Sequence, residues 1–103
     1  MIKGTTPTLH FNIPIEASAI KSAEIVVEYV DDNKQVLIVK EKSDCVIGEN
    51  CISTSLTQEE TLQLPAPSFV HIQLRVLTTD EIALATEAVK VSVKRLLKEG
   101  VIE

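Results

Sequence analysis

A series of short stretches in which polar and apolar residues alternate, separated by clusters of turn-forming residues, constrains this chain more than any other feature. Successive side chains of a β-strand point to opposite faces, so this alternation predicts strands with one buried face. The clearest stretch covers residues 70–77, with Val70, Ile72, Leu74 and Val76 as its apolar positions. We therefore expect a central strand there.

Residues 8–13 predict another strand, in which the apolar residues at every second position share one face. Pro7 and Pro14 flank it. Because proline lacks the amide hydrogen that a sheet ladder needs, this strand is expected at the edge of a sheet.

The same alternation predicts further strands over residues 23–30, 35–42, 44–47, 51–56 and 82–93. In the first of these, the core face is expected to carry Ile25, Val27 and Tyr29. The polar residues 31–34 are typical of a hairpin turn. The apolar run 36–39 predicts either burial on both faces of its strand or a bulge.

Helical structure is expected only in short pieces. Thr57 and Glu60 have the spacing of a capping box, in which each side chain accepts a hydrogen bond from the other residue's amide. Residues 16–20 fit either a helical turn or a loop. Residues 94–99 predict a short helix before Gly100.

About seven strands with one helical turn predict an all-β fold, an antiparallel β-sandwich of the immunoglobulin-like type. The connections are too short for the crossover helices of a parallel sheet. At 103 residues the chain forms a single domain over residues 1–103. Residues 1–7 are expected to be an N-terminal arm, either mobile or lying on a neighbour and dispensable for folding, and residues 94–103 a C-terminal tail.

Composition excludes several classes of partner. Ten Lys and Arg against fifteen Asp and Glu give a net charge of −5, and no basic stripe is present, so we expect no nucleic-acid binding. No apolar run is long enough for a secretory signal or a membrane span. We therefore expect no membrane partner and a protein that stays in a cytoplasm.

The residues that carry chemistry do not form a recognisable site. His10 and His71 are expected on solvent-facing sides of strands, and zinc would need four nitrogen or sulfur ligands at suitable spacing. The carboxylate pairs lie in expected turns, at residues 31–32, 59–60 and 80–81. We therefore assign no catalytic residue, no cofactor and no metal ligand, and expect a protein that is not an enzyme.

Cys45 and Cys51 flank the turn around Gly48. A three-residue loop over 47–49 would set the two cysteines opposite each other on adjacent strands, whereas a two-residue loop would offset them. Two reduced thiols are the expectation in a reducing cytoplasm, and pairing stays open.

Several segments follow one another in a characteristic order: MIKGTTPT over residues 1–8, the alternating and valine-rich strands, LTQEETL over 56–62 and QLRVLT over 73–78. In this order and spacing the chain resembles small proteins encoded in the tail or baseplate regions of phages and prophages of Gram-positive bacteria. It is also similar in size and pattern to the N-terminal β-sandwich module of upper baseplate proteins.

The resemblance implies a structural or assembly protein that binds other phage structural proteins, in several symmetric copies, within the host cytoplasm during assembly or in the virion. It brings no catalytic residues. The candidate partner-binding residues are those of the arm, Thr5, Thr6, Pro7 and Thr8. The alternative is a soluble β-sandwich binding domain for a host protein or a carbohydrate, and the scarcity of aromatic residues counts against sugar stacking.

Overall fold

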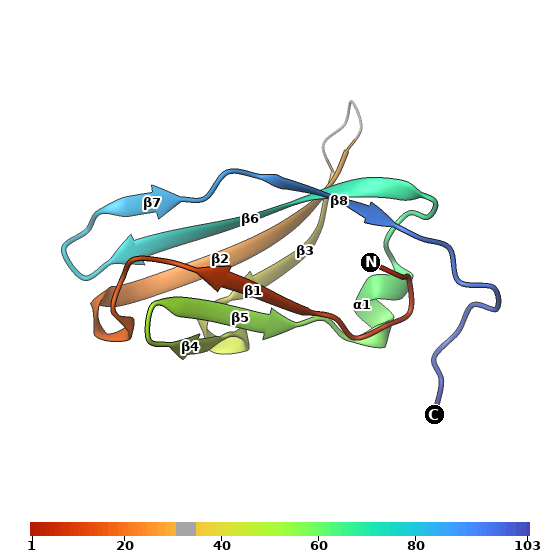
Figure 1. Ribbon diagram of the computed structural model, residues 1–103, viewed down its shortest axis with the longest axis horizontal. Coiled ribbons are helices and arrows are strands. Elements are labelled where there is room, and N and C mark those ends of the chain that lie inside the picture. Colours follow the sequence, from red (N-terminus) through yellow and green to blue (C-terminus); the bar gives the residue numbers. More distant parts are fainter. Residues whose placement is uncertain (31–34) are drawn as a thin grey trace.

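The computed structural model describes residues 1–30 and 35–103, and these form two antiparallel β-sheets packed face to face (Figure 1). The expected hairpin turn over residues 31–34 lies outside the described residues. The smaller sheet has the order β1-β5-β4, with bounds Thr8–Asn12, Cys51–Ser55 and Val46–Gly48. The larger sheet has the order β3-β2-β6-β7, with bounds Val36–Glu41, Ile20–Tyr29, Ser68–Thr78 and Ala83–Ala85, and β8 (Val89–Val93) also pairs with β6.

The predicted all-β fold with antiparallel sheets is confirmed, and its immunoglobulin-like type stays a prediction. In the described part of the chain, three short helices lie between strands: η1 (Ala17–Ala19), η2 (Lys42–Asp44) and α1 (Gln58–Leu62). Of the two alternatives for residues 16–20, the helical turn is therefore right for residues 17–19.

One predicted strand is divided in two, so the described chain has eight strands instead of about seven. Residues 82–93 form β7 and β8, and Thr86 lies between them. Its hydroxyl accepts a hydrogen bond from the Leu74 amide over 3.1 Å, and its own amide donates to the Leu74 carbonyl oxygen over 2.9 Å. The threonine side chain thus takes the place of a main-chain acceptor, which ends the regular ladder at this point.

The hydrophobic core lies between the sheets and comes from the alternating residues of β2, β5 and β6. Ile25, Val27, Ile52 and Val70 are completely buried. The predicted central strand is confirmed, because β6 pairs with β2 on one side and with β7 and β8 on the other. Tyr29, expected on the core face, is only half-buried.

The apolar run in β3 reflects a bulge and not burial on both faces. Val27 pairs with Ile38, but the next residue, Glu28, pairs with Val36, so Leu37 is an extra residue on β3. Ile38 is buried, whereas Val36 is 50% exposed.

The capping box of α1 is confirmed. The Glu60 amide donates to Thr57 Oγ1 over 3.1 Å, and the Thr57 amide donates to Glu60 Oε1 over 2.9 Å. Glu60 also forms an ion pair with Lys40, with 2.7 Å between Oε1 and Nζ. Partial burial acts to raise the pKa of the Glu60 carboxyl, but Lys40 and the Thr57 amide outweigh it and hold this pKa below its usual value.

The helix predicted over residues 94–99 is wrong. Only Lys94 is engaged in regular structure there, through a parallel bridge to Ile2, and the residues after it have no helix. A helix of so few residues makes too few hydrogen bonds to offset the cost of nucleation, and Leu97, at 94% exposure, has no packing that would compensate.

Candidate functional site

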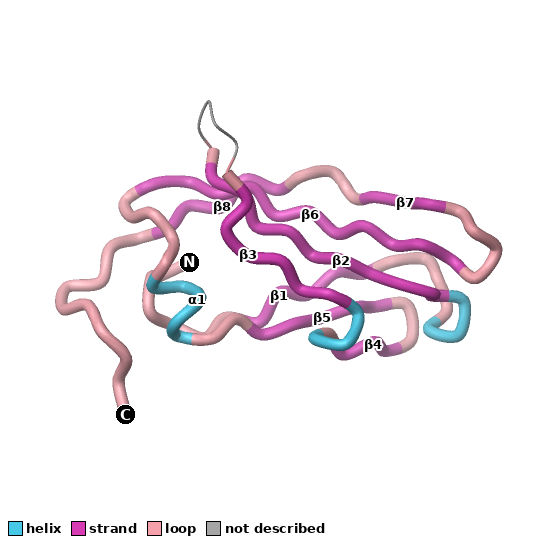
Figure 2. The backbone as a smooth tube through the Cα atoms, turned by 180° about the vertical axis from the view of Figure 1, so that it is seen from behind, coloured by secondary structure: helices cyan, strands magenta, loops and turns pink. Residues whose placement is uncertain are grey.

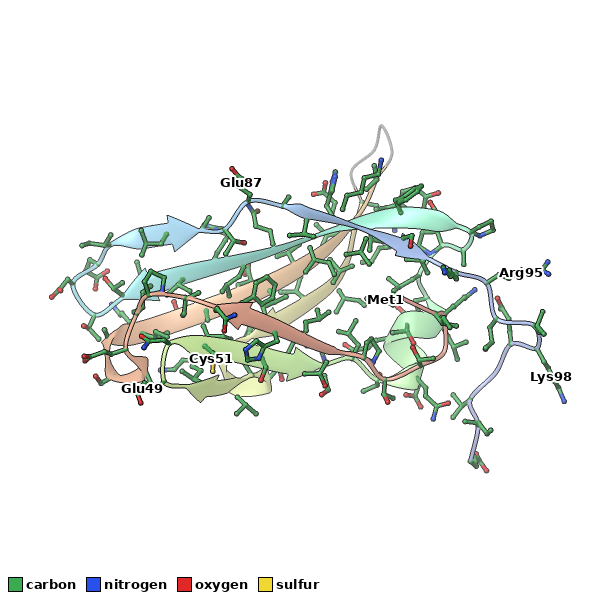
Figure 3. All side chains as sticks on the ribbon, in the orientation of Figure 1. Met1, Glu49, Cys51, Glu87, Arg95 and Lys98 are labelled. Carbon is green, nitrogen blue, oxygen red and sulfur yellow. The ribbon has the colours of Figure 1, made fainter. Side chains whose placement is uncertain are left out.

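The N-terminal arm lies against its own chain in this structure. The Met1 ammonium donates a hydrogen bond to the Ser92 carbonyl oxygen over 3.0 Å. The Lys94 amide donates to the Met1 carbonyl oxygen over 2.8 Å, and the Lys3 amide donates to the Lys94 carbonyl oxygen over 3.1 Å. Residues 1–3 therefore extend the larger sheet beside the end of β8. Figure 3 shows Met1 between β8 and α1, whereas Arg95 and Lys98 lie on the tail that leaves the sandwich.

The candidate partner-binding residues of the arm have different surroundings. The Thr5 carbonyl oxygen accepts a hydrogen bond from the buried Thr61 hydroxyl over 2.7 Å, and the Pro7 carbonyl oxygen accepts one from the Leu56 amide over 3.0 Å. The side chains of Thr5 and Thr6 are exposed. Thr8 is the first residue of β1 and the one member of the set that lies in a strand.

β1 is an end strand of the smaller sheet, as its flanking prolines predicted. Hydrogen bonds at its two ends decide which way its main-chain groups point. The Ile13 amide donates to the Asn50 carbonyl oxygen over 2.9 Å, and the Leu56 amide donates to the Pro7 carbonyl oxygen over 3.0 Å. The residues of β1 whose amides and carbonyl oxygens point toward β5 are therefore those at odd positions.

The residues of β1 at even positions face the free side of the strand. In an antiparallel pair, residues alternate between bonding the neighbour and pointing away from it. The amides and carbonyl oxygens of Thr8, His10 and Asn12 consequently point away from β5, and within residues 1–30 and 35–103 no main-chain group bonds them from that side. We call these groups the free β1 edge.

The other sheet edges carry features that natural proteins use to prevent strand addition. β3 is bulged, and its Lys40 points inward to Glu60 with only 14% of its side chain exposed. β4 and β7 have three residues each, and residues 1–3 lie along the end of β8. The free β1 edge is longer than β4 or β7, is regular and has no Lys, Arg, Asp or Glu, so it is the least protected of these edges.

Beside the free β1 edge the larger sheet is incompletely covered. Leu84 pairs with buried Val76 and Val89 pairs with buried Ile72, so both face the interior, yet they are 46% and 53% exposed. Figure 1 shows β7 and β8 extending beyond the edge of the smaller sheet. A cavity of about 140 Å³ lies here, lined by Asn12, Ile13, Pro14, Ile15, Leu74, Val76, Leu84, Ala85 and Thr86. We call this region the open side.

A larger hollow of about 920 Å³ lies near the start of β2 and also reaches Val76 and Leu84. Its lining includes Ala23 from the inner face of the larger sheet and Glu24 from the outer face, so it is an open depression and not an enclosed pocket. The remaining lining residues are Ser22, Glu41, Lys42, Ser43, Cys45, Ile47, Arg75, Leu77 and Ala83.

Cys45 lines this depression without the features of a nucleophile. Burial raises the pKa of its thiol, and the Asp44 carboxylate acts in the same direction. A nucleophilic cysteine needs a lowered pKa. Gly48 pairs with Cys51, which leaves a two-residue turn and offsets the two cysteines, and both thiols are free.

The remaining titratable candidates are separate from one another. His10 Nε2 lies 3.1 Å from Asn12 Oδ1, whereas His71 is on β6 in the other sheet. Glu81 pairs with Lys21, and residues 31–32 lie outside the described residues. Among the residues that the structure describes, no group of three or more His, Cys, Asp or Glu side chains is placed to hold a metal ion.

Comparison with known proteins gives no relative: no family model, no curated protein and no solved structure matches this chain. No helix in the described part of the chain has the length and apolar character needed to cross a membrane.

Proposed function

We propose that this protein is a non-enzymatic structural or assembly component of a phage tail or baseplate, and that it binds other phage structural proteins through the free β1 edge. The observation that carries the proposal is that the outward main-chain groups of Thr8, His10 and Asn12, beside the open side, have no main-chain partner among the described residues. The assignment to a phage rests on the resemblance of residues 1–8, 56–62 and 73–78 to small phage tail or baseplate proteins. This assignment implies that the protein acts in the host cell during assembly.

The order of the strands supports a sandwich of the immunoglobulin-like type with one position vacant. Such sandwiches have the orders A-B-E-D and C-F-G, with C′ added beside C in variable-type domains. With β1 taken as B and the following strands named in chain order, the two sheets become B-E-D and C′-C-F-G, where β7 and β8 share position G. The position of A, next to β1, has no strand among the described residues.

A strand from a partner fits this vacant position. Its main chain would bond the three outward-facing residues of the free β1 edge, as in other complexes formed by strand addition. Its inward side chains would cover Leu84 and Val89 and enter the cavity of about 140 Å³. Burial of these apolar groups would add to the main-chain bonds.

A proline substitution tests the free β1 edge. Because the His10 amide points away from β5, His10→Pro removes a donor from the free edge and leaves the bonds between β1 and β5 in place. Immobilised protein is incubated with a lysate of host cells in which phage particles assemble, and retained proteins are identified by mass spectrometry. We expect the unsubstituted protein to retain a tail or baseplate protein. The retained amount of that protein is expected to fall about tenfold or more with His10→Pro.

Ala83→Pro is the matched control. The Thr78 amide donates to the Ile82 carbonyl oxygen, so the alternation along β7 points the Ala83 amide out of the free edge of the larger sheet, and the Ala83 side chain lies on the opposite face of that sheet from Leu84. This variant is expected to retain the partner fully, and melting curves check the fold of both variants. Equal capture by His10→Pro, or capture of no phage structural protein by the unsubstituted chain, would overturn the proposal.

A further inference from the structure

The outer face of the larger sheet, which points away from the smaller sheet, has no described element packed against it (Figure 2). Its side chains come from the strand positions that alternate with the core. They include Glu24, Val26 and Glu28 on β2, Val36, Val39 and Glu41 on β3, Phe69, His71, Gln73 and Arg75 on β6, and Lys90 on β8.

This outer face is more apolar than the solvated face of an antiparallel sheet normally is, since such faces are mainly polar. Val36, Val39 and Phe69 are 50%, 45% and 46% exposed, respectively. Val26, at the centre of the face, is half-buried by its neighbours alone. A partner that covers this face would remove these side chains from water.

The charges on the outer face are separated by sign. Glu24, Glu28 and Glu41 occupy the half formed by β2 and β3. Arg75 and Lys90 occupy the half formed by β6 and β8. The division runs along the strands, between β2 and β6.

The strand register arranges these charges in two rows across the face. One row runs from Glu41 through Glu24 to Arg75. The second row runs from Glu28 through His71 to Lys90. Each row therefore begins with a glutamate and ends with a basic residue, Arg75 in the first row and Lys90 in the second.

We infer that the outer face binds a second copy of this chain, face to face, about a two-fold axis that runs parallel to the strands between β2 and β6. Such an axis keeps each row in place and exchanges its two ends. Glu24 of one copy then lies opposite Arg75 of the other, and Glu28 lies opposite His71 and near Lys90. Because the interface is isologous, each of these attractions occurs twice.

The other symmetric arrangement is unfavourable. A two-fold axis perpendicular to the strands exchanges the two rows and leaves each residue on its own half of the face. Glu24 of one copy would then lie opposite Glu28 of the other. Like charges in contact across an interface are repulsive, so the charge pattern selects the first arrangement.

Glu24 and Arg75 are available for this contact. Their closest charged atoms lie 3.8 Å apart within one chain, and 41% of the Glu24 side chain and 66% of the Arg75 side chain are exposed. An exposed ion pair at this distance contributes little to folding. In the dimer the two pairs form a ring of four alternating charges around the axis.

This inference goes beyond the proposed function, because the outer face lies on the opposite side of the larger sheet from the smaller sheet and its free β1 edge. A dimer formed in this way leaves both free β1 edges accessible. Each copy therefore presents its own binding edge.

Charge exchange at two positions tests the inference. Glu24→Arg and Arg75→Glu each place like charges around the axis, so each variant alone is expected to have a dimer dissociation constant raised about tenfold or more. Mixed with each other, the two variants are expected to form a heterodimer, because each opposing pair again has opposite signs. Their masses are measured by sedimentation velocity across a wide concentration range.

Glu49→Arg is the matched control, since it makes the same charge change on the exposed turn between β4 and β5 (Figure 3). It is expected to leave the dimer unchanged. A strict monomer at all concentrations, or a dimer that the two reversals do not weaken, would overturn the inference. A dimer that His10→Pro disrupts and that Glu24→Arg and Arg75→Glu do not would also overturn the inference. The free β1 edge would then be the surface that joins the two copies.

Discussion

Removal of residues 1–6 is expected to lower the free energy of unfolding by about 4 kcal/mol. This segment makes hydrogen bonds with Ser92, Lys94 and the buried Thr61, and half-buried Met1 packs against the core. Each hydrogen bond contributes about 1 kcal/mol net, and the packing of Met1 adds to it. Urea unfolding followed by circular dichroism measures the change.

Removal of residues 100–103 is the control for this deletion. These residues contribute only exposed hydrogen bonds between Gln58 and Ile102, so the loss is expected to stay below about 1 kcal/mol. An unchanged urea midpoint after removal of residues 1–6 would show that the arm does not stabilise the fold. That result would agree with the sequence-based expectation of a dispensable arm, and it would contradict a stabilising role for the hydrogen bonds of the arm with Ser92, Lys94 and Thr61.

Ile25→Ala is expected to lower the free energy of unfolding by about 3 kcal/mol. Ile25 has no exposed surface and lies at the centre of β2, between Lys40 of β3 and Leu74 of β6. Its truncation loses the transfer free energy of the deleted atoms and leaves a cavity that the tightly packed sheets cannot close. The same urea unfolding measurement gives the effect.

Val39→Ala provides the comparison in the adjacent strand. Val39 is 45% exposed on the outer face, and its truncation is expected to cost less than about 1 kcal/mol. Equal losses for the two variants would mean that the two faces of the larger sheet are not distinguished by burial. The described separation of inner and outer faces would then be wrong.

Features that depend on local chemistry were predictable from the sequence. The capping box at Thr57 and Glu60 needs only residues three positions apart, and the alternation in residues 70–77 directly reports one buried face. The prolines around residues 8–13 correctly indicated an edge strand, because their effect on a ladder is local as well.

Features that depend on distant residues were not predictable in the same way. The break between β7 and β8 arises because the Thr86 hydroxyl bonds Leu74 of another strand, and the alternation of residues 82–93 carries no sign of it. The docking of the arm joins Met1 to Ser92, which lie 91 positions apart. Neither contact has a short-range signature.

The candidate site was predictable only in part. Thr8 was among the predicted partner-binding residues and belongs to the free β1 edge, whereas His10 and Asn12 were predicted only as members of the edge strand over residues 8–13. An edge strand by itself does not say which of its residues face outward, because this depends on the register with β5. Two main-chain bonds, at Pro7 and Ile13, supply that register.

Amide hydrogen exchange along β1, resolved by residue with NMR spectroscopy, tests most directly the claim that β1 offers a free binding edge. In the isolated protein we expect slow exchange at Leu9 and Phe11, which bond β5, and fast exchange at Thr8, His10 and Asn12. In a complex with a captured partner the latter three amides are expected to become slow. Equally slow exchange of all five amides in the isolated protein, or unchanged fast exchange at the three even positions in the complex, would contradict the account.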